Sequence, residues 1–154
     1  MTVRPATSTD IAAVIQLERT IAEAPHWAAS EYSMMLAPAL GSVRRCLFVA
    51  ESDRGLIGFA VGKVIGMGSE SSSELESVAV SSDARRTGVG RSLCAAVIEW
   101  CRTQGAAEIE LEVRTASTGA IALYSGLGFF VEGERPGYYQ EPTDDAVLMR
   151  LKLA

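Results

Sequence analysis

The sequence predicts an α/β fold built on a mixed β-sheet, and two observations support this. First, the turn residues Ser52–Gly55 join two segments rich in β-branched and aromatic residues, which predicts an antiparallel hairpin. Second, strand-like and helix-like segments alternate in the second half of the chain, which predicts at least one parallel crossover. A sheet that contains both the hairpin and the crossover is mixed.

Seven strands and four helices are expected, in the order βααβββαβαββ. The strands are expected at residues 2–5, 46–51, 56–65, 74–80, 108–113, 129–132 and 147–151. The helices are expected from caps within 8–10 to about residue 22, at 28–36, at 88–104, and from a cap at 117 or 118 to residues 126–128. The small, polar residues 66–73 are expected to form a loop. Capping side chains at Ser8, Thr9 and Asp10 begin the first helix, a cap at Ser117 or Thr118 begins the last, and Gly105 ends the third.

Composition and charge limit the classes of function that this protein can have. The 154 residues, 48% of them hydrophobic, suffice for one domain spanning residues 1–154. A net charge of −5 argues against nucleic acid as a partner. No apolar run approaches the roughly 20 residues that span a bilayer, so no membrane partner is expected.

The cysteines and the histidine argue against a metal site. Cys46, Cys94 and Cys101 form no CxxC pair and His26 is the only histidine, so no zinc is expected. Core packing is the simplest explanation of the cysteines. Their odd number and the lack of a signal peptide predict a reducing, cytoplasmic location.

A basic, glycine-rich turn lies between an expected strand and an expected helix. It consists of Arg85, Arg86, Thr87, Gly88, Val89, Gly90 and Arg91. The first N–H groups of a helix have no intrahelical partner, and with the helix dipole they attract anions. The residues therefore suit a pyrophosphate, although a glycine-rich helix cap beside a solvated basic run is an equally simple explanation. The third glycine of a dinucleotide-binding fingerprint is replaced by Leu93.

This turn fits the signature of the GNAT superfamily of N-acetyltransferases: a Gln or Arg, any two residues, a Gly, any residue, and a Gly or Ala. Three further stretches, Leu111–Arg114, Ala120–Tyr124 and Leu127–Phe129, resemble the bacterial ribosomal-protein alanine N-acetyltransferases in particular. The resemblance covers nearly the whole chain and is densest from Ser77 to Leu151. It implies a GNAT-like fold, with a central, mostly antiparallel sheet of about seven strands flanked by about four helices.

The resemblance also implies a cofactor, acetyl-CoA, and roles for individual residues. Glu112 matches the proton acceptor of the family and Tyr124 its proton donor to the leaving thiolate. The cofactor would be held by Val78, Ala79, Val80, Arg85, Arg86, Thr87, Gly88, Val89, Gly90, Arg91, Ser117 and Tyr124, with Ser117 where the family usually has asparagine. The acceptor groove would be lined by Trp27, Tyr138 and Tyr139, the two tyrosines lying in the last loop. A kink in the strand at 74–80 would free backbone N–H groups to stabilise the acetyl oxygen.

Alternatives remain for the two catalytic assignments. Glu108, Glu110 and Glu112 share one face of the expected strand, so the pattern alone predicts a solvent-facing residue at 112. Glu74 and Glu76 share a face of the preceding strand, and either could be the base instead. Tyr124 could be an amphipathic core tyrosine.

The acceptor is expected to be the N-terminal alanine of a ribosomal or other protein. A model α-amine has a pKa of about 7.7–8.0 and lysine about 10.4, so the α-amine loses its proton more readily at neutral pH. The alternatives are a small amine, an antibiotic or a lysine side chain as acceptor, a non-catalytic acyl-CoA-binding module, and a structural domain without a ligand.

Overall fold

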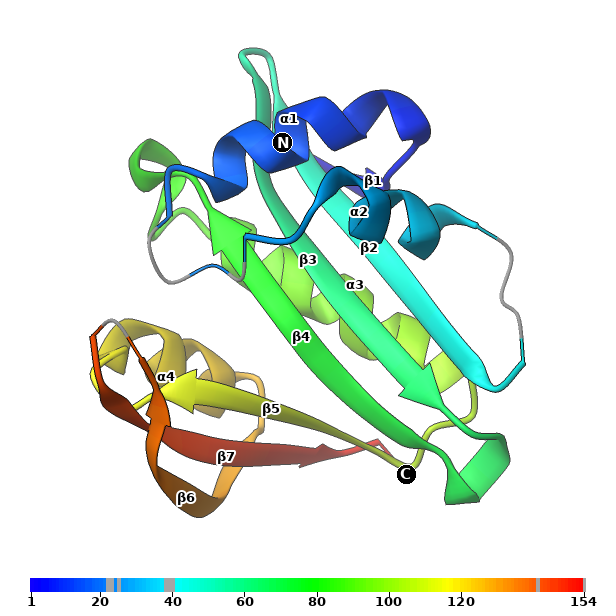
Figure 1. Cartoon of the computed structure of the whole chain (residues 1–154), viewed down its shortest axis with the longest axis vertical. Coiled ribbons are helices and arrows are strands. Elements are labelled where there is room, and N and C mark those ends of the chain that lie inside the picture. Colours follow the sequence, from blue (N-terminus) through cyan, green and yellow to red (C-terminus); the bar gives the residue numbers. More distant parts are fainter. Residues whose placement is uncertain (22–23, 25, 38–40, 141, 154) are drawn as a thin grey trace.

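The structure is a computed structural model that describes residues 1–21, 24, 26–37, 41–140 and 142–153. One seven-stranded sheet has the order β1-β2-β3-β4-β5-β7-β6 (Figure 1). Its strands are β1 (Thr2–Pro5), β2 (Val43–Ser52), β3 (Gly55–Ile65), β4 (Ser72–Val80), β5 (Glu108–Arg114), β6 (Phe130–Tyr139) and β7 (Asp144–Lys152). The helices are α1 (Ile11–Glu18), α2 (Ala29–Leu36), α3 (Val89–Thr103) and α4 (Thr118–Gly126).

The strand pairing confirms a mixed, mostly antiparallel sheet. Ser52 pairs with Gly55, so β2 and β3 form the expected hairpin. The pair β4–β5 is the parallel one, and its register consists of a single pair, Glu74 with Glu110. Beyond this pair β5 diverges from β4, and β5, β7 and β6 form a separate arm of the sheet (Figure 1).

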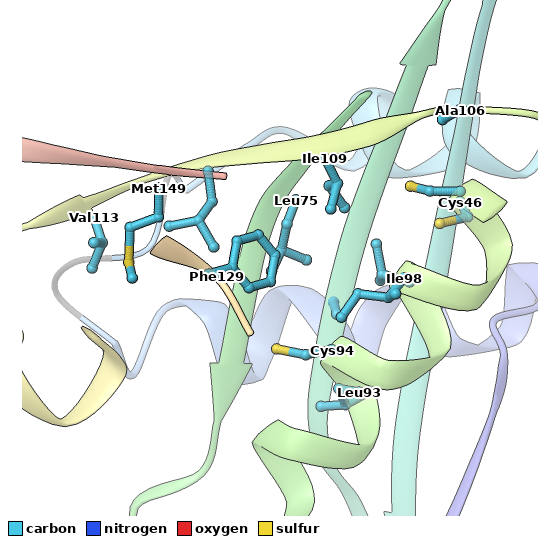
Figure 2. Packing of buried hydrophobic residues seen from close by; sticks show 14 of the residues in the cluster. Cys46, Leu75, Leu93, Cys94, Ile98, Ala106, Ile109, Val113, Phe129 and Met149 are labelled. Carbon is cyan, nitrogen blue, oxygen red and sulfur yellow. The ribbon is translucent and has the colours of Figure 1, made fainter. Parts of the chain in front are cut away.

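Helices cover both faces of the sheet and create two hydrophobic cores. On one face, α1 and α2 bury Val14, Tyr32 and Met35 against β2 and β3. On the other face, α3 buries Leu93, Val97 and other apolar residues, and α4 packs against the same cluster. Figure 2 shows Phe129, Leu75 and Ile109 gathered in this second core beside α3. The free cysteines Cys46, Cys94 and Cys101 are buried, as core packing predicts.

Strand β4 contains the expected kink. Val61 of β3 pairs with Ser77, but the next residue, Gly62, pairs with Leu75. Glu76 is therefore an extra residue in β4, which is the definition of a β-bulge. The bulge lies close to the point where β4 and β5 separate.

The prediction for the last two strands was partly wrong. The sequence predicts a strand at 129–132 with Tyr138 and Tyr139 in a loop, but β6 continues to Tyr139. Pro136 and Gly137 argue locally against a strand, and Gly137 has a φ of 62°. β6 is an edge strand with a register shift between Arg135 and Tyr139, and edges and bulges are where strands tolerate proline and glycine.

Several other boundaries differ from the prediction. Ser8–Asp10 form a 3₁₀ turn before α1, and the Thr7 backbone N–H donates to the Asp10 carboxylate at 2.7 Å. α1 ends at Glu18, while Ala22, the expected end, lies outside the described residues. β2 begins at Val43 and β4 at Ser72, both earlier than expected, because pairing with β3 extends them. In the described part of the chain no helix is long and apolar enough to cross a membrane.

Candidate functional site

A cavity of about 430 Å³ lies where β4 and β5 diverge. Its walls come from the segment before α2, from β4 and β5, from the start of α4 and from the end of β6. Seven of the residues to which the family resemblance assigns a role line it: Trp27, Val78, Glu112, Ser117, Tyr124, Tyr138 and Tyr139. The expected catalytic and acceptor-binding residues therefore meet in one cavity, although they come from four separate segments.

Glu112 differs from the other glutamates of β5 in its ionic partner. Arg150 of β7 binds Glu108 at 2.6 Å and Glu110 at 2.9 Å. The Glu112 side chain is 23% exposed, and its partner is the exposed guanidinium of Arg135, with a separation of 3.7 Å. The Glu112 carboxylate lies on the cavity wall, where its ion pair with Arg135 is long and the Tyr138 hydroxyl is its other neighbour, so it remains available to a ligand.

Glu74 and Glu76 line the same cavity but have different surroundings. The Glu76 carboxylate accepts two hydrogen bonds from the Arg45 guanidinium, at 3.1 and 3.0 Å, and is thereby held in a two-pronged ion pair. Glu74 lies 4.0 Å from the Lys63 ammonium. Burial, together with the negative charges of Glu76, Glu112 and Glu110, raises the pKa of Glu74. Both Glu74 and Glu112 are thus placed to accept a proton in this cavity.

Tyr124 lies on α4, and its ring packs edge-on against Phe129 with the ring centroids 5.9 Å apart. Burial raises the pKa of the Tyr124 phenol above its usual value of about 10. The hydroxyl therefore keeps its proton throughout the neutral range. At the cavity wall such a group can donate a proton, and it is a poor proton acceptor.

Tyr138 and Tyr139 form an aromatic pair at the end of β6. Their ring centroids are 5.1 Å apart in a T-shaped arrangement, and arginines lie over both rings: Arg135 over Tyr138 at 5.3 Å and Arg114 over Tyr139 at 4.5 Å. Interaction with the Glu112 carboxylate raises the pKa of Tyr138. Burial, with a smaller contribution from Glu112, raises the pKa of Tyr139 to about 12.

Trp27 is positioned by residues that were not singled out in the sequence. Its backbone N–H donates to Glu18 at 3.2 Å, and its ring lies 5.8 Å from that of the fully buried Tyr32. The Tyr32 hydroxyl also donates to Glu18, which is 1% exposed. The sequence did contain a signal for Glu18, because it lies four residues after Val14 on the buried side of the first helix.

The basic, glycine-rich turn has the backbone that an anion site requires. Gly88, with a φ of 89°, is the N-cap of α3, and Arg86 is also left-handed, with a φ of 63°. Arg85, Arg86 and Arg91 are exposed, whereas the Val89 side chain is buried and leaves only its backbone to a ligand. A Cβ on Gly90 would lie 3.3 Å from Leu123 of α4, so glycine permits the close approach of these helices.

The turn and the remaining predicted cofactor residues do not line the cavity. The Thr87 hydroxyl donates to the carbonyl of Ala84. Ala79 is buried with the α1 and α2 core, and Val80 packs against the α3 core at the end of β4. Among the described residues, no group of three or more His, Cys, Asp or Glu side chains could hold a metal ion.

Comparison with family models decides where the chain belongs. Residues 11–129 match the model of the acetyltransferase (GNAT) family. The chain belongs to the GNAT family. The matched segment contains the turn at 85–91, the bulge of β4, Glu112 and Tyr124. The family resemblance inferred from the turn is thereby confirmed.

The chain is also similar to curated relatives. It is 35% identical over 107 residues to the ribosomal protein bS18-alanine N-acetyltransferase of Salmonella typhimurium, covering 67% of this chain and 68% of that enzyme. The Escherichia coli enzyme of that name is 38% identical over 82 residues, 52% of this chain and 55% of the enzyme. A Mycobacterium leprae protein is 33% identical over 145 residues, 94% of this chain but only 38% of that protein.

Solved structures share the fold. The ribosomal-protein-S18-alanine N-acetyltransferase of Escherichia coli superimposes with a TM-score of 0.80 at 27% identity, covering 99% of this chain and 94% of that one. Ard1 of Thermoplasma volcanium superimposes with a TM-score of 0.79 at 26% identity, covering 99% and 97%. Arabidopsis thaliana NAA60, solved in complex with acetyl-CoA, has a TM-score of 0.84 at 17% identity, covers 99% and 98%, and shows the common fold alone.

Proposed function

We propose that this domain transfers the acetyl group of acetyl-CoA to the α-amine at a protein N-terminus, with an N-terminal alanine as the preferred acceptor. The observation that carries the proposal is the cavity between β4 and β5, which joins Glu112, Tyr124 and the pair Tyr138–Tyr139. The bS18-alanine acetyltransferases among the relatives support this choice and suggest a ribosomal protein as the acceptor.

The residues present suit acetyl-CoA, which would supply a thioester-activated acetyl group. The N-terminus of α3, opened by the left-handed Gly88 and flanked by three exposed arginines, would hold the pyrophosphate. The end of β4, from Val78 to Val80, would pair through its backbone with the pantetheine arm. The Ser117 hydroxyl, on the cavity wall, would add one hydrogen bond.

Glu112 would bind the acceptor amine and accept its proton. An incoming ammonium group can displace the exposed Arg135 guanidinium, since the 3.7 Å ion pair is loose and exposed pairs contribute little. Glu74, whose raised pKa favours proton uptake, stands as the alternative base on the opposite strand. The pKa of an α-amine is about 2.5 units lower than that of lysine, so the α-amine loses its proton more readily at neutral pH.

Tyr124 would donate its proton to the departing thiolate, since burial keeps the phenol protonated. The bulge at Glu76 would help to stabilise the acetyl oxygen in the same cavity. A bulge leaves one residue outside the regular ladder, so its backbone N–H can face negative charge that develops on the acetyl oxygen.

The pair Tyr138–Tyr139 would recognise the acceptor backbone. Tyr138 is 48% exposed and lines the cavity, so its ring is open to a peptide chain. Trp27 forms another part of the wall. We also expect a cytoplasmic location and a single domain over residues 1–154.

A thiol-release assay with three peptides tests the proposal. One peptide has a free N-terminal alanine, the second has that end blocked, and the third has a lysine behind a blocked end. Release with the first alone supports the proposal. Release with the third assigns lysine as the acceptor. If no peptide causes thiol release but acetyl-CoA still binds, the acceptor is a small molecule or the domain is a non-catalytic binder. If acetyl-CoA does not bind either, the result supports a structural domain without a ligand.

A further inference from the structure

Arg45, on β2, makes contacts with two separate parts of the cavity wall. Its guanidinium donates from Nε and Nη2 to the two carboxylate oxygens of Glu76, at 3.1 and 3.0 Å. The same guanidinium lies over the indole of Trp27, with its central carbon 5.3 Å from the ring centroid. Glu76 and Trp27 both line the cavity, whereas Arg45 is not among the lining residues.

The contacts with Glu76 fix the conformation of the β-bulge. Glu76 is the extra residue of the bulge, so its backbone lacks the regular pairing that holds the rest of β4 in register. A two-pronged arginine–carboxylate pair fixes distance and orientation together. The Glu76 and Arg45 side chains are 10% and 20% exposed, so solvent weakens this pair less than it would a surface pair.

The contact with Trp27 holds a second part of the cavity wall. The segment before α2 is held by Glu18, through the Trp27 backbone, and by Arg45, over the indole ring. Nη1 of Arg45 also donates to Glu31 of α2, at 2.9 Å. One guanidinium thus connects the bulge of β4, the indole of Trp27 and helix α2.

We infer that Arg45 is a positioning residue that holds the bulge at Glu76 and the wall at Trp27 in the arrangement that acceptor and acetyl group require. The inference rests on the proposed function, because a positioning role has meaning only if the cavity is where transfer takes place. Arg45 contacts the side chains of Glu76 and Trp27 and not the Glu76 backbone N–H that would face the acetyl oxygen, so its effect on the rate would be exerted by positioning these two residues.

Three variants and one matched control test this inference. Arg45→Met removes the guanidinium, Arg45→Lys keeps the charge but not the two-pronged pair, and Arg45→Met with Glu76→Gln removes both charges in case the first variant does not fold. Arg44→Met is the control, because Arg44 is the adjacent, half-buried arginine and donates to Gln104 and to the Gly66 carbonyl, away from the cavity.

Kinetics and fluorescence provide the two measurements. We expect Arg45→Met to lower kcat about tenfold or more, because small misplacements in an active site are costly. Arg45→Lys should recover most of the lost thermal stability but little of the lost kcat. The KM for acetyl-CoA should stay within about twofold. In a Trp100→Phe background, which leaves Trp27 as the single tryptophan, Arg45→Met should increase quenching of Trp27 by acrylamide.

The outcomes separate this inference from the proposed function. Unchanged kcat or unchanged Trp27 quenching in Arg45→Met would overturn the positioning role, as would an equal kcat loss in Arg44→Met at equal thermal stability. If the wild-type domain acetylates no peptide, the proposed function fails, while the quenching comparison still decides whether Arg45 holds Trp27 in place.

Discussion

At the scale of single residues, the surroundings of each carboxylate distinguish side chains that the sequence left equivalent. Glu108, Glu110 and Glu112 alternate along one strand, and their common face was predictable from that alternation. Arg150 comes from β7, some forty residues later, and binds only the first two. Ion pairing across distant strands depends on register, which the alternation alone does not specify.

Tyr124 gives a prediction at this scale. Tyr124→Phe should keep the ring packing against Phe129, so the melting temperature should hardly change. It removes the proton donor, so turnover should fall about a hundredfold, the lower end of typical acid–base contributions. Thiol release and thermal unfolding measure the two effects. Equal turnover in both proteins would show that Tyr124 does not donate the proton.

The pH dependence of the wild-type enzyme gives a second prediction. Because burial raises the pKa of Tyr124, the phenol stays protonated at a pH where an ordinary tyrosine, of pKa about 10, begins to ionise. Loss of the donor proton should therefore produce no decline in kcat between pH 8 and about 10. The assignment would be contradicted if kcat of the wild type declined in that range and kcat of Tyr124→Phe did not.

At the scale of elements, the turn before α3 was predictable and the end of β6 was not. The spacing of Gly88 and Gly90 predicted a helix N-terminus, and α3 begins at Val89. In β6, Pro136 and Gly137 favour a loop locally, but pairing with β7 continues to Tyr139 through an irregular register. Strand pairing is a tertiary interaction, and it overrode the local preference.

The turn gives a prediction for this scale. Gly88→Ala should lower the free energy of unfolding by about 1–2 kcal/mol, because a left-handed φ of 89° is unfavourable for alanine. A changed turn should also weaken coenzyme A binding. Gly133→Ala is the control, since a Cβ there would meet no atom within 4 Å and Gly133 is not left-handed. Urea unfolding and calorimetric titration measure both quantities, and equal values for the two variants would contradict the account.

At the scale of the whole molecule, the divergence of β4 and β5 creates the cavity. The sequence predicted a mixed sheet and a parallel crossover, and the structure confirms both. The family resemblance implied a kink in β4, and the bulge at Glu76 confirms it. The contacts of Arg45 with Glu76 and Trp27 were not predicted, because they join three segments whose proximity depends on packing.

The core that supports this divergence gives a prediction of its own. Phe129 is 4% exposed and lies in the α3 core (Figure 2). Its ring also packs against Tyr124. Phe129→Ala should lower the free energy of unfolding by about 3–5 kcal/mol, as large-to-small core substitutions do. Phe130→Ala is the control, because that side chain is 45% exposed and should change stability by less than about 1 kcal/mol. Denaturant unfolding that gave equal losses would contradict the packing described here.

The most direct test of the central claim is kcat/KM against pH for Glu112→Gln, measured on a peptide with a free N-terminal alanine. Glu108→Gln is the control, because Glu108 lies on the same face of β5 but is bound by Arg150 away from the cavity. We predict a loss of about a hundredfold in Glu112→Gln below the amine pKa of about 8, a smaller loss above it, and unchanged coenzyme A affinity. A profile for Glu112→Gln that matches the wild type at every pH would contradict the claim that Glu112 accepts the proton.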